Sequence, residues 1–77
     1  MTPTETWRIQ QYLRKTFGNG GISVLQSSDL RGVVEVEVDG EFLGVVHRDE
    51  DEGEVSYSLM ISILEEDLPP AGPVQHH

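Results

Sequence analysis

The sequence predicts an α+β fold, in which one N-terminal helix packs on a four-stranded antiparallel β-sheet in the order α-β-β-β-β. Apolar residues recur at helical spacing only near the N-terminus, and they alternate at strand spacing after residue 21. The connections are too short for parallel crossovers, so neighbouring strands should be antiparallel. We expect a single α+β domain over residues 1–65 and a flexible, acidic and proline-containing tail over residues 66–77.

The helix is predicted over residues 3–17. Thr2 is suited to cap its N-terminus, with Pro3 at the first helical position and Glu5 three residues after the cap. Gly18 can adopt the left-handed conformation that ends a helix. We expect one apolar stripe to pack on the sheet, formed by Ile9, Tyr12, Leu13 and Phe17.

Four strands are predicted after the helix, at residues 22–26, 33–38, 41–46 and 55–64. The pair Asp39-Gly40 between two alternating runs indicates a two-residue type I′ hairpin turn. We expect Arg48 to Glu54 to form an acidic turn before the last strand.

The position of this turn sets the register that we expect for the hairpin. On one face, Val38 should lie opposite Glu41, Val36 opposite Leu43 and Val34 opposite Val45. That face should be covered by the helix. Phe42 and Val46 would then lie on the second, uncovered face.

Composition limits the function classes. The formal net charge is −9, and residues 33–77 carry twelve acids against one cation, so a nucleic-acid ligand is not expected. No apolar run has the length of a signal peptide or of a membrane span, so we expect a cytoplasmic protein that does not bind membranes. The absence of cysteine suits a reducing compartment.

No residue pattern predicts catalysis, a cofactor or a metal site. The acidic segment fails the calcium-loop pattern, because Arg48 and Leu59 would fall at ligand positions when Gly53 takes the glycine position. His47 stands alone, and such a histidine is more often packed than a ligand. His76 and His77 could bind metal weakly or be the remnant of an expression tag.

Apolar residues outside the predicted core point to protein binding. Trp7 lies away from the helical stripe and close to Arg14, so it either packs over the helix or anchors a partner. A polar rim around apolar residues on the second sheet face favours a symmetric dimer. The candidates for the interaction surface are Trp7, Arg14, Val33, Phe42, Val46, Met60 and Leu64.

The sequence therefore predicts a non-catalytic protein-protein interaction module, with itself or another protein as partner. Two alternatives stay open. The acidic segment could bind a divalent metal weakly, or the acidic half of the chain could act as a decoy of nucleic acid. The decoy is less favoured because its acids crowd into one segment instead of spreading over a large surface.

The chain resembles a known family. The segments that carry the resemblance are Tyr12 to Asn19, Ile22 to Val24, Gly40 to Val45 and Arg48 to Glu54, followed by the last alternating strand. They are similar to short, uncharacterised bacterial proteins known only as a domain of unknown function, over about residues 3 to 67. The resemblance implies a single domain and carries no catalytic residue or cofactor.

Overall fold

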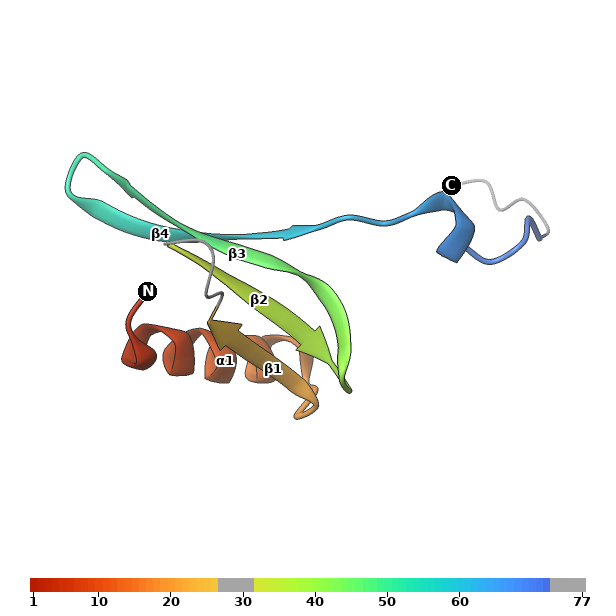
Figure 1. Cartoon of the computed structure of the whole chain (residues 1–77), viewed down its shortest axis with the longest axis horizontal. Coiled ribbons are helices and arrows are strands. Elements are labelled where there is room, and N and C mark those ends of the chain that lie inside the picture. Colours follow the sequence, from red (N-terminus) through yellow and green to blue (C-terminus); the bar gives the residue numbers. More distant parts are fainter. Residues whose placement is uncertain (27–31, 73–77) are drawn as a thin grey trace.

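The computed structural model describes residues 1–26 and 32–72, and it confirms the predicted fold class (Figure 1). Helix α1 spans Pro3–Phe17. The strands pair antiparallel in the order β1-β2-β3-β4, and their bounds are Ile22–Gln26, Val33–Val38, Glu41–Asp51 and Glu54–Ile61. A 3-10 turn follows at Glu65–Asp67. The expectations for residues 27–31, for residues 73–77 and for His76 and His77 lie outside the described residues.

Both ends of α1 follow the predicted caps. The Thr2 hydroxyl accepts a 3.1 Å hydrogen bond from the Glu5 N–H, and Glu5 Oε1 accepts one of 3.1 Å from the Thr2 N–H. Gly18 is left-handed, with φ +61°, and its N–H donates to the carbonyl of Lys15. The capping box and the glycine thus satisfy backbone groups that a helix leaves unpaired at its ends.

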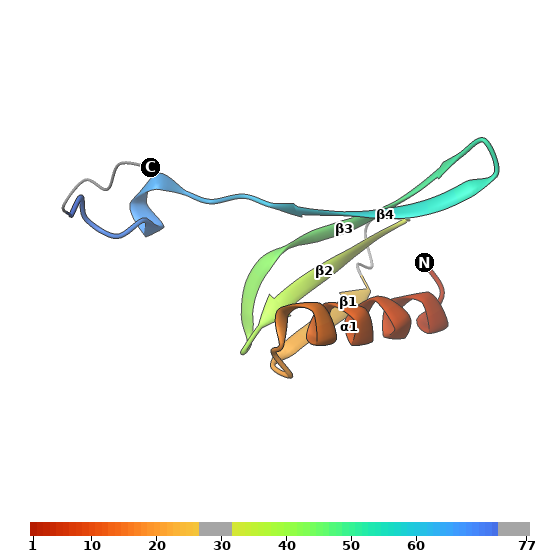
Figure 2. The ribbon, with the colours of Figure 1, turned by 180° about the vertical axis from the view of Figure 1, so that it is seen from behind.

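The helix runs along β1, and its side chains bond the outer edge of that strand (Figure 2). Gln10 Oε1 accepts a 2.9 Å hydrogen bond from the Val24 N–H. Arg14 Nε donates one of 2.7 Å to the carbonyl of Ile22. Backbone groups on an unpaired edge would otherwise be available to another strand, so these two bonds cover the β1 edge.

The core lies between α1 and the first three strands. Ile9 and Leu13 are the apolar helix residues that are buried, and the sheet residues packed against them are Ile22, Val24, Val34, Val36 and Val46. Tyr12 and Phe17 were predicted to share this buried stripe, and that prediction was wrong, since they are 67% and 57% exposed. The reason is that the helix packs mainly on β1, so a groove stays open between β4 and the side of the helix that carries Tyr12 and Phe17.

The β2–β3 hairpin has the predicted turn but a different register. Asp39 and Gly40 have φ of +52° and +87°, as a type I′ turn requires. Val38 pairs with Glu41, but a β-bulge then inserts Leu43, so that Gly44 faces Val36 and Val46 faces Val34. Val46 was predicted on the open face, and this was wrong. It is only 2% exposed and belongs to the core.

In the β3–β4 hairpin, β3 extends farther toward the turn than predicted, and β4 ends earlier than predicted. The expected acidic turn from Arg48 to Glu54 is mostly strand, because Glu52 and Gly53 alone form the turn, with φ of +51° and +82°. The predicted last strand also ran too far. β4 ends at Ile61, the partner of Gly44, and Leu64 lies beyond it.

Candidate interaction surface

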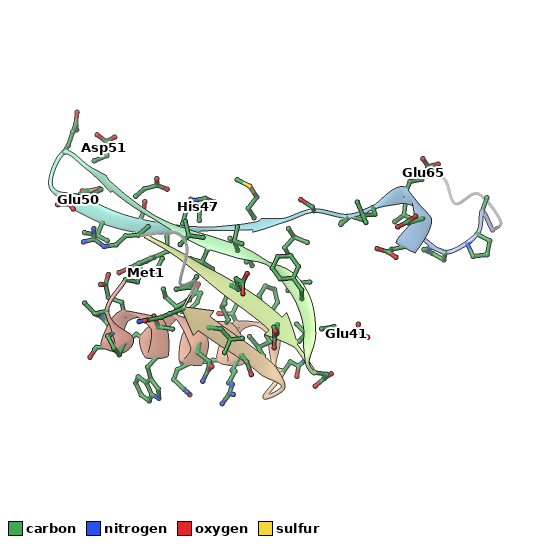
Figure 3. All side chains as sticks on the ribbon, in the orientation of Figure 1. Met1, Glu41, His47, Glu50, Asp51 and Glu65 are labelled. Atoms are coloured by element: carbon green, nitrogen blue, oxygen red, sulfur yellow. The ribbon has the colours of Figure 1, made fainter. Side chains whose placement is uncertain are left out.

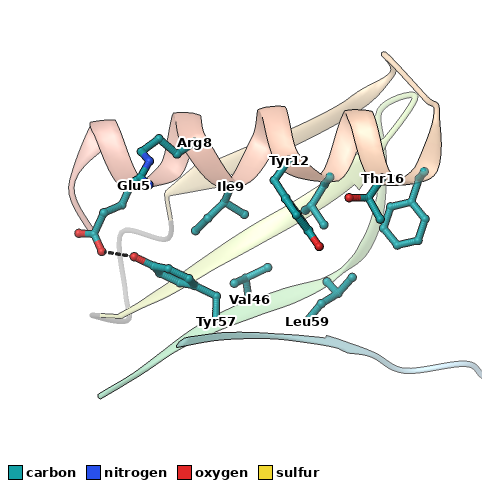
Figure 4. A pocket seen from close by; sticks show the side chains of 10 residues that line it. Glu5, Arg8, Ile9, Tyr12, Thr16, Val46, Tyr57 and Leu59 are labelled. Atoms are coloured by element: carbon teal, nitrogen blue, oxygen red, sulfur yellow. Dashed lines mark hydrogen bonds between the residues drawn. The ribbon is translucent and has the colours of Figure 1, made fainter. Parts of the chain in front are cut away.

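The sheet face that carries α1 is covered only in part. Because α1 follows β1, a groove of about 650 Å³ remains between the helix and β4 (Figure 4). Its walls are mainly apolar and come from both elements and from β3: Ile9, Tyr12, Leu13, Phe17, Val46 and Leu59. Of these wall residues, Val46 was a predicted candidate, whereas Leu59 on β4 and the exposed helix residues Tyr12 and Phe17 were not.

A polar cluster closes the groove at the helix N-terminus. The Tyr57 hydroxyl donates a 2.6 Å hydrogen bond to Glu5 Oε2, and Arg48 Nε donates one of 3.0 Å to the same oxygen (Figure 4 shows the first). Arg48 Nη1 also donates a 3.1 Å bond to Glu50. This cluster joins α1 to β3 and β4, where apolar contact with the helix ends.

The hydrogen bonds in this cluster stabilise one protonation state. The bond from Tyr57, followed by the backbone bond from Thr2, lowers the pKa of Glu5 to about 2. The hydrogen bond between Tyr57 and Glu5 also raises the pKa of the Tyr57 phenol. The pKa of Arg48 is raised mainly by its hydrogen bond to Glu50. At neutral pH the carboxylate is charged and the phenol is neutral, so the cluster joins the helix to β3 and β4 through charge-assisted hydrogen bonds.

Strand β4 is exposed on both faces, although it belongs to the sheet. On the side of the helix its residues are Val55, Tyr57, Leu59 and Ile61, of which only Leu59 is half-buried. The chain from Val55 to Leu64 contains no charged residue. An exposed edge strand of this composition is unusual, because exposed edges normally carry charges.

The open face of the sheet carries part of the predicted patch. Phe42 is 64% exposed there, and Met60 and Val33 lie on the same face. Leu25 and Val45, which the sequence did not single out, join Met60 in one row across the sheet. Glu35 lies in that row between Leu25 and Val45, and it divides the apolar surface.

The remaining predicted surface residues are dispersed. Trp7 is 61% exposed and lines a shallow depression with Leu25 at the outer side of β1. Arg14 is half-buried and bonds the carbonyl of Ile22, so it holds the fold together. Leu64 lies on the segment after β4, exposed and away from the sheet. The structure therefore does not bring the predicted residues into one site.

The acidic segment offers no built metal site in the part of the chain that the structure describes. Asp49 pairs with Ser56 and Glu50 with Val55, so consecutive carboxylates fall on opposite faces of the strand. Figure 3 shows Glu50 and Asp51 at this end and His47 farther along β3. Over residues 1–26 and 32–72, no three His, Cys, Asp or Glu side chains are grouped to hold a metal.

His47 is half-buried on the open face and lies within β3, where it pairs with Val33 and Ser58. No helix in the described ranges is long and apolar enough to cross a membrane.

The fold defines a class of small protein with one helix on one half of an open antiparallel sheet, and the surface adds an apolar groove beside an uncovered edge strand. The family model described as "Protein of unknown function (DUF3126)" matches residues 5–67, and the chain belongs to this family. No curated protein and no solved structure matches it.

Proposed function

We propose that this protein is a non-catalytic protein-protein interaction module that binds through the half of its sheet formed by β3 and β4. The observation that carries the proposal is the apolar groove between α1 and β4, which no helix or strand within residues 1–26 and 32–72 covers. Contiguous apolar surface of this kind marks sites of association in soluble proteins.

The size of the chain supports the proposal. A chain of 77 residues buries only about 60% of its unfolded surface, and here the buried apolar residues all lie under or beside α1. A partner on the β3–β4 half would bury side chains that the single chain cannot cover. A homodimer is the version that we favour, because a small domain gains stability from a second subunit.

The polar groups at the groove support a structural role more than a catalytic one. Glu5, Arg48 and Tyr57 bond one another, and the carboxylate is held charged by its neighbours. A general acid or base needs a pKa near the working pH, and the pKa of Glu5 is moved away from it. No observation favours the metal-binding or nucleic-acid-decoy alternatives.

The earlier prediction of a dimer through the open sheet face stays a prediction, now with Leu25 and Val45 beside Phe42 and Met60. Glu35 interrupts that surface, so we place the open face second to the groove. A cytoplasmic location is part of the proposal, because the cysteine-free composition suits a reducing compartment.

Affinity capture from the native cells, together with sedimentation of the purified protein, tests the proposal. The variants are Tyr12→Glu in the groove and Phe42→Glu on the open face; both residues are exposed, so the fold should be kept. Thr4→Glu, on the exposed side of α1, is a charge-matched control. We expect association that Thr4→Glu keeps. Loss of association in Tyr12→Glu would place the contact in the groove, and its survival in that variant would place the contact along the β4 strand. A strict monomer that captures no partner would contradict the proposal.

A further inference from the structure

We propose that the partner is a second copy of this chain, paired antiparallel along β4 across a two-fold axis, so that two four-stranded sheets form one continuous sheet. This inference rests on the proposed function and specifies both its partner and its contact. The axis is perpendicular to the sheet, so the two helices lie on the same face.

The two edges of the sheet differ in how they are covered. At the β1 edge, Gln10 and Arg14 bond the outward N–H of Val24 and the outward carbonyl of Ile22. At the β4 edge, no described strand or helix lies beside the chain on its outer side. The fold therefore protects one edge and leaves the other available for strand pairing.

The exposed edge also lacks the features that prevent pairing. Natural edge strands are protected by charges, prolines, bulges or short length. The ten residues from Val55 to Leu64 include no charge and no proline, in a chain of which 25% is charged. The pairing of β4 with β3 is regular from Asp51–Glu54 to Gly44–Ile61, without a bulge.

The chain continues beyond its own pairing partner. The last pair of the β3–β4 ladder is Gly44 with Ile61. After it, the segment runs on away from the sheet (Figures 1 and 2), Leu64 is extended with φ −83° and ψ 139°, and Ile63 is 72% exposed. β3 curves away from this segment near its own start (Figures 1 and 2), so the β3–β4 ladder ends at Gly44 and Ile61. A strand from another chain can pair with the segment.

The edge is complementary to itself. Directly opposed residues of an antiparallel pair share a face, so a two-fold axis places apolar residues against apolar residues on the helix side. On the other side the neighbours are mainly serines, at Ser56, Ser58 and Ser62. Although each chain carries a net charge of −9, the two chains meet along uncharged strands, with acids only at the ends, at Glu54 and Glu65.

The pairing would also extend the apolar floor beside each groove. Tyr57, Leu59 and Ile61 of one copy would adjoin the same residues of the other, between the two helices. Cross-strand pairs of aromatic and β-branched residues stabilise a sheet. The contact is isologous, so it closes at two copies and leaves the covered β1 edges at the outside.

Cysteine cross-linking tests this arrangement without background, because the chain has no cysteine of its own. The variants Ser56→Cys, Ser58→Cys and Met60→Cys lie on the open face, Ser62→Cys follows the end of β4, and all four positions are exposed. Ser23→Cys on β1 is the matched control. Each variant alone, and each mixture of two, is oxidised and separated on a non-reducing gel.

In antiparallel two-fold pairing, the residue numbers of two directly opposed positions always add up to the same value. We therefore expect the pairs that cross-link fastest to share that one sum. Directly opposed Cβ atoms lie about 4.5–5.5 Å apart and diagonal ones about 7–8 Å apart, so pairs with other sums should cross-link several-fold more slowly. Ser23→Cys should not cross-link above the level of random collision.

Two results would overturn the inference, and they bear differently on the proposed function. A dimer in which the β4 positions cross-link no faster than Ser23→Cys would exclude β4 pairing and keep the interaction module. A strict monomer at high concentration would exclude the second copy altogether. Capture of a partner by the wild type but not by Tyr12→Glu would then decide whether the module binds a different protein.

Discussion

The hydroxyl of Tyr57 on β4 donates a 2.6 Å hydrogen bond to Oε2 of Glu5 in the first turn of α1. These residues are 52 positions apart in the sequence. Glu5 also completes the capping box with Thr2, so one side chain stabilises the start of the helix and holds it to the far strand. The position of β4 relative to the helix, and therefore the shape of the groove, depends on this contact.

Replacing Tyr57 by phenylalanine should raise the pKa of Glu5 from about 2 toward its ordinary value of 4.5, because the largest cause of the shift is removed. The pKa can be followed by NMR of the Glu5 side chain during an acid titration. Tyr12→Phe is the control, since Tyr12 is exposed on the opposite groove wall. An unchanged Glu5 pKa in Tyr57→Phe would show that the hydrogen bond does not hold the carboxylate.

Glu5 should make stability depend on pH in acid. Its folded pKa is lowered, so its contribution is complete above 4.5 and is lost as the pH falls from 4.5 toward about 2. The urea midpoint of wild type should therefore approach that of Glu5→Gln over this window. A constant gap between wild type and Glu5→Gln would contradict the coupling.

Tyr57 should add an alkaline limit. The bond to Glu5 raises the pKa of its phenol, so its contribution is present below pH 10.0 and is lost as the pH rises through the folded pKa. The measurement is the urea midpoint of wild type and Tyr57→Phe at neutral and alkaline pH. Equal alkaline losses in the two proteins would argue against this role.

Gly44 should be required where β4 crosses close to β3. A Cβ on Gly44 would overlap the carbonyl oxygen of Met60, which is backbone and cannot move alone. We expect Gly44→Ala to lower the free energy of unfolding by about 1–3 kcal/mol. Gly20→Ala is the control, because a Cβ at Gly20 meets no atom within 4 Å. Equal stabilities of the two variants would contradict the close approach.

The bulge at Leu43 can be tested by truncating two neighbours. Val46 is buried in the core, whereas Val45 is half-buried on the open face. Val46→Ala should cost about 2 kcal/mol of unfolding free energy, and Val45→Ala about 1 kcal/mol or less. Chemical denaturation measures both. The reverse order would support the register without the bulge.

Several elements were predictable because their signals are local. The Thr2 cap, Pro3 and Gly18 bounded α1 correctly, and Asp39-Gly40 located the first hairpin turn. Glu52-Gly53 forms a second turn with positive φ at both residues. It was not located from the sequence, because the acidic residues around it were interpreted as one long turn. The uncharged run from Val55 to Leu64 was visible in the sequence, but it was interpreted as one strand over its whole length, whereas β4 ends at Ile61.

The rest depended on contacts that no local pattern contains. The bulge moved Val46 into the core because two residues of β3 face one of β2 at that point, and this shifted all later pairs. The exposure of Tyr12 follows from the attachment of α1 to the β1 edge through Gln10 and Arg14. The contact of Tyr57 with Glu5 joins the two ends of the fold, so it could not be read from spacing.

Amide hydrogen exchange in β4, measured by NMR at several protein concentrations, tests the central claim most directly. In a single chain the outward N–H groups of β4 face solvent and should exchange rapidly. If β4 pairs with a second copy, outward amides between Val55 and Leu64 should become slower to exchange as the concentration rises, while Val24, already bonded to Gln10, should not change. Exchange in β4 that is independent of concentration would contradict the account.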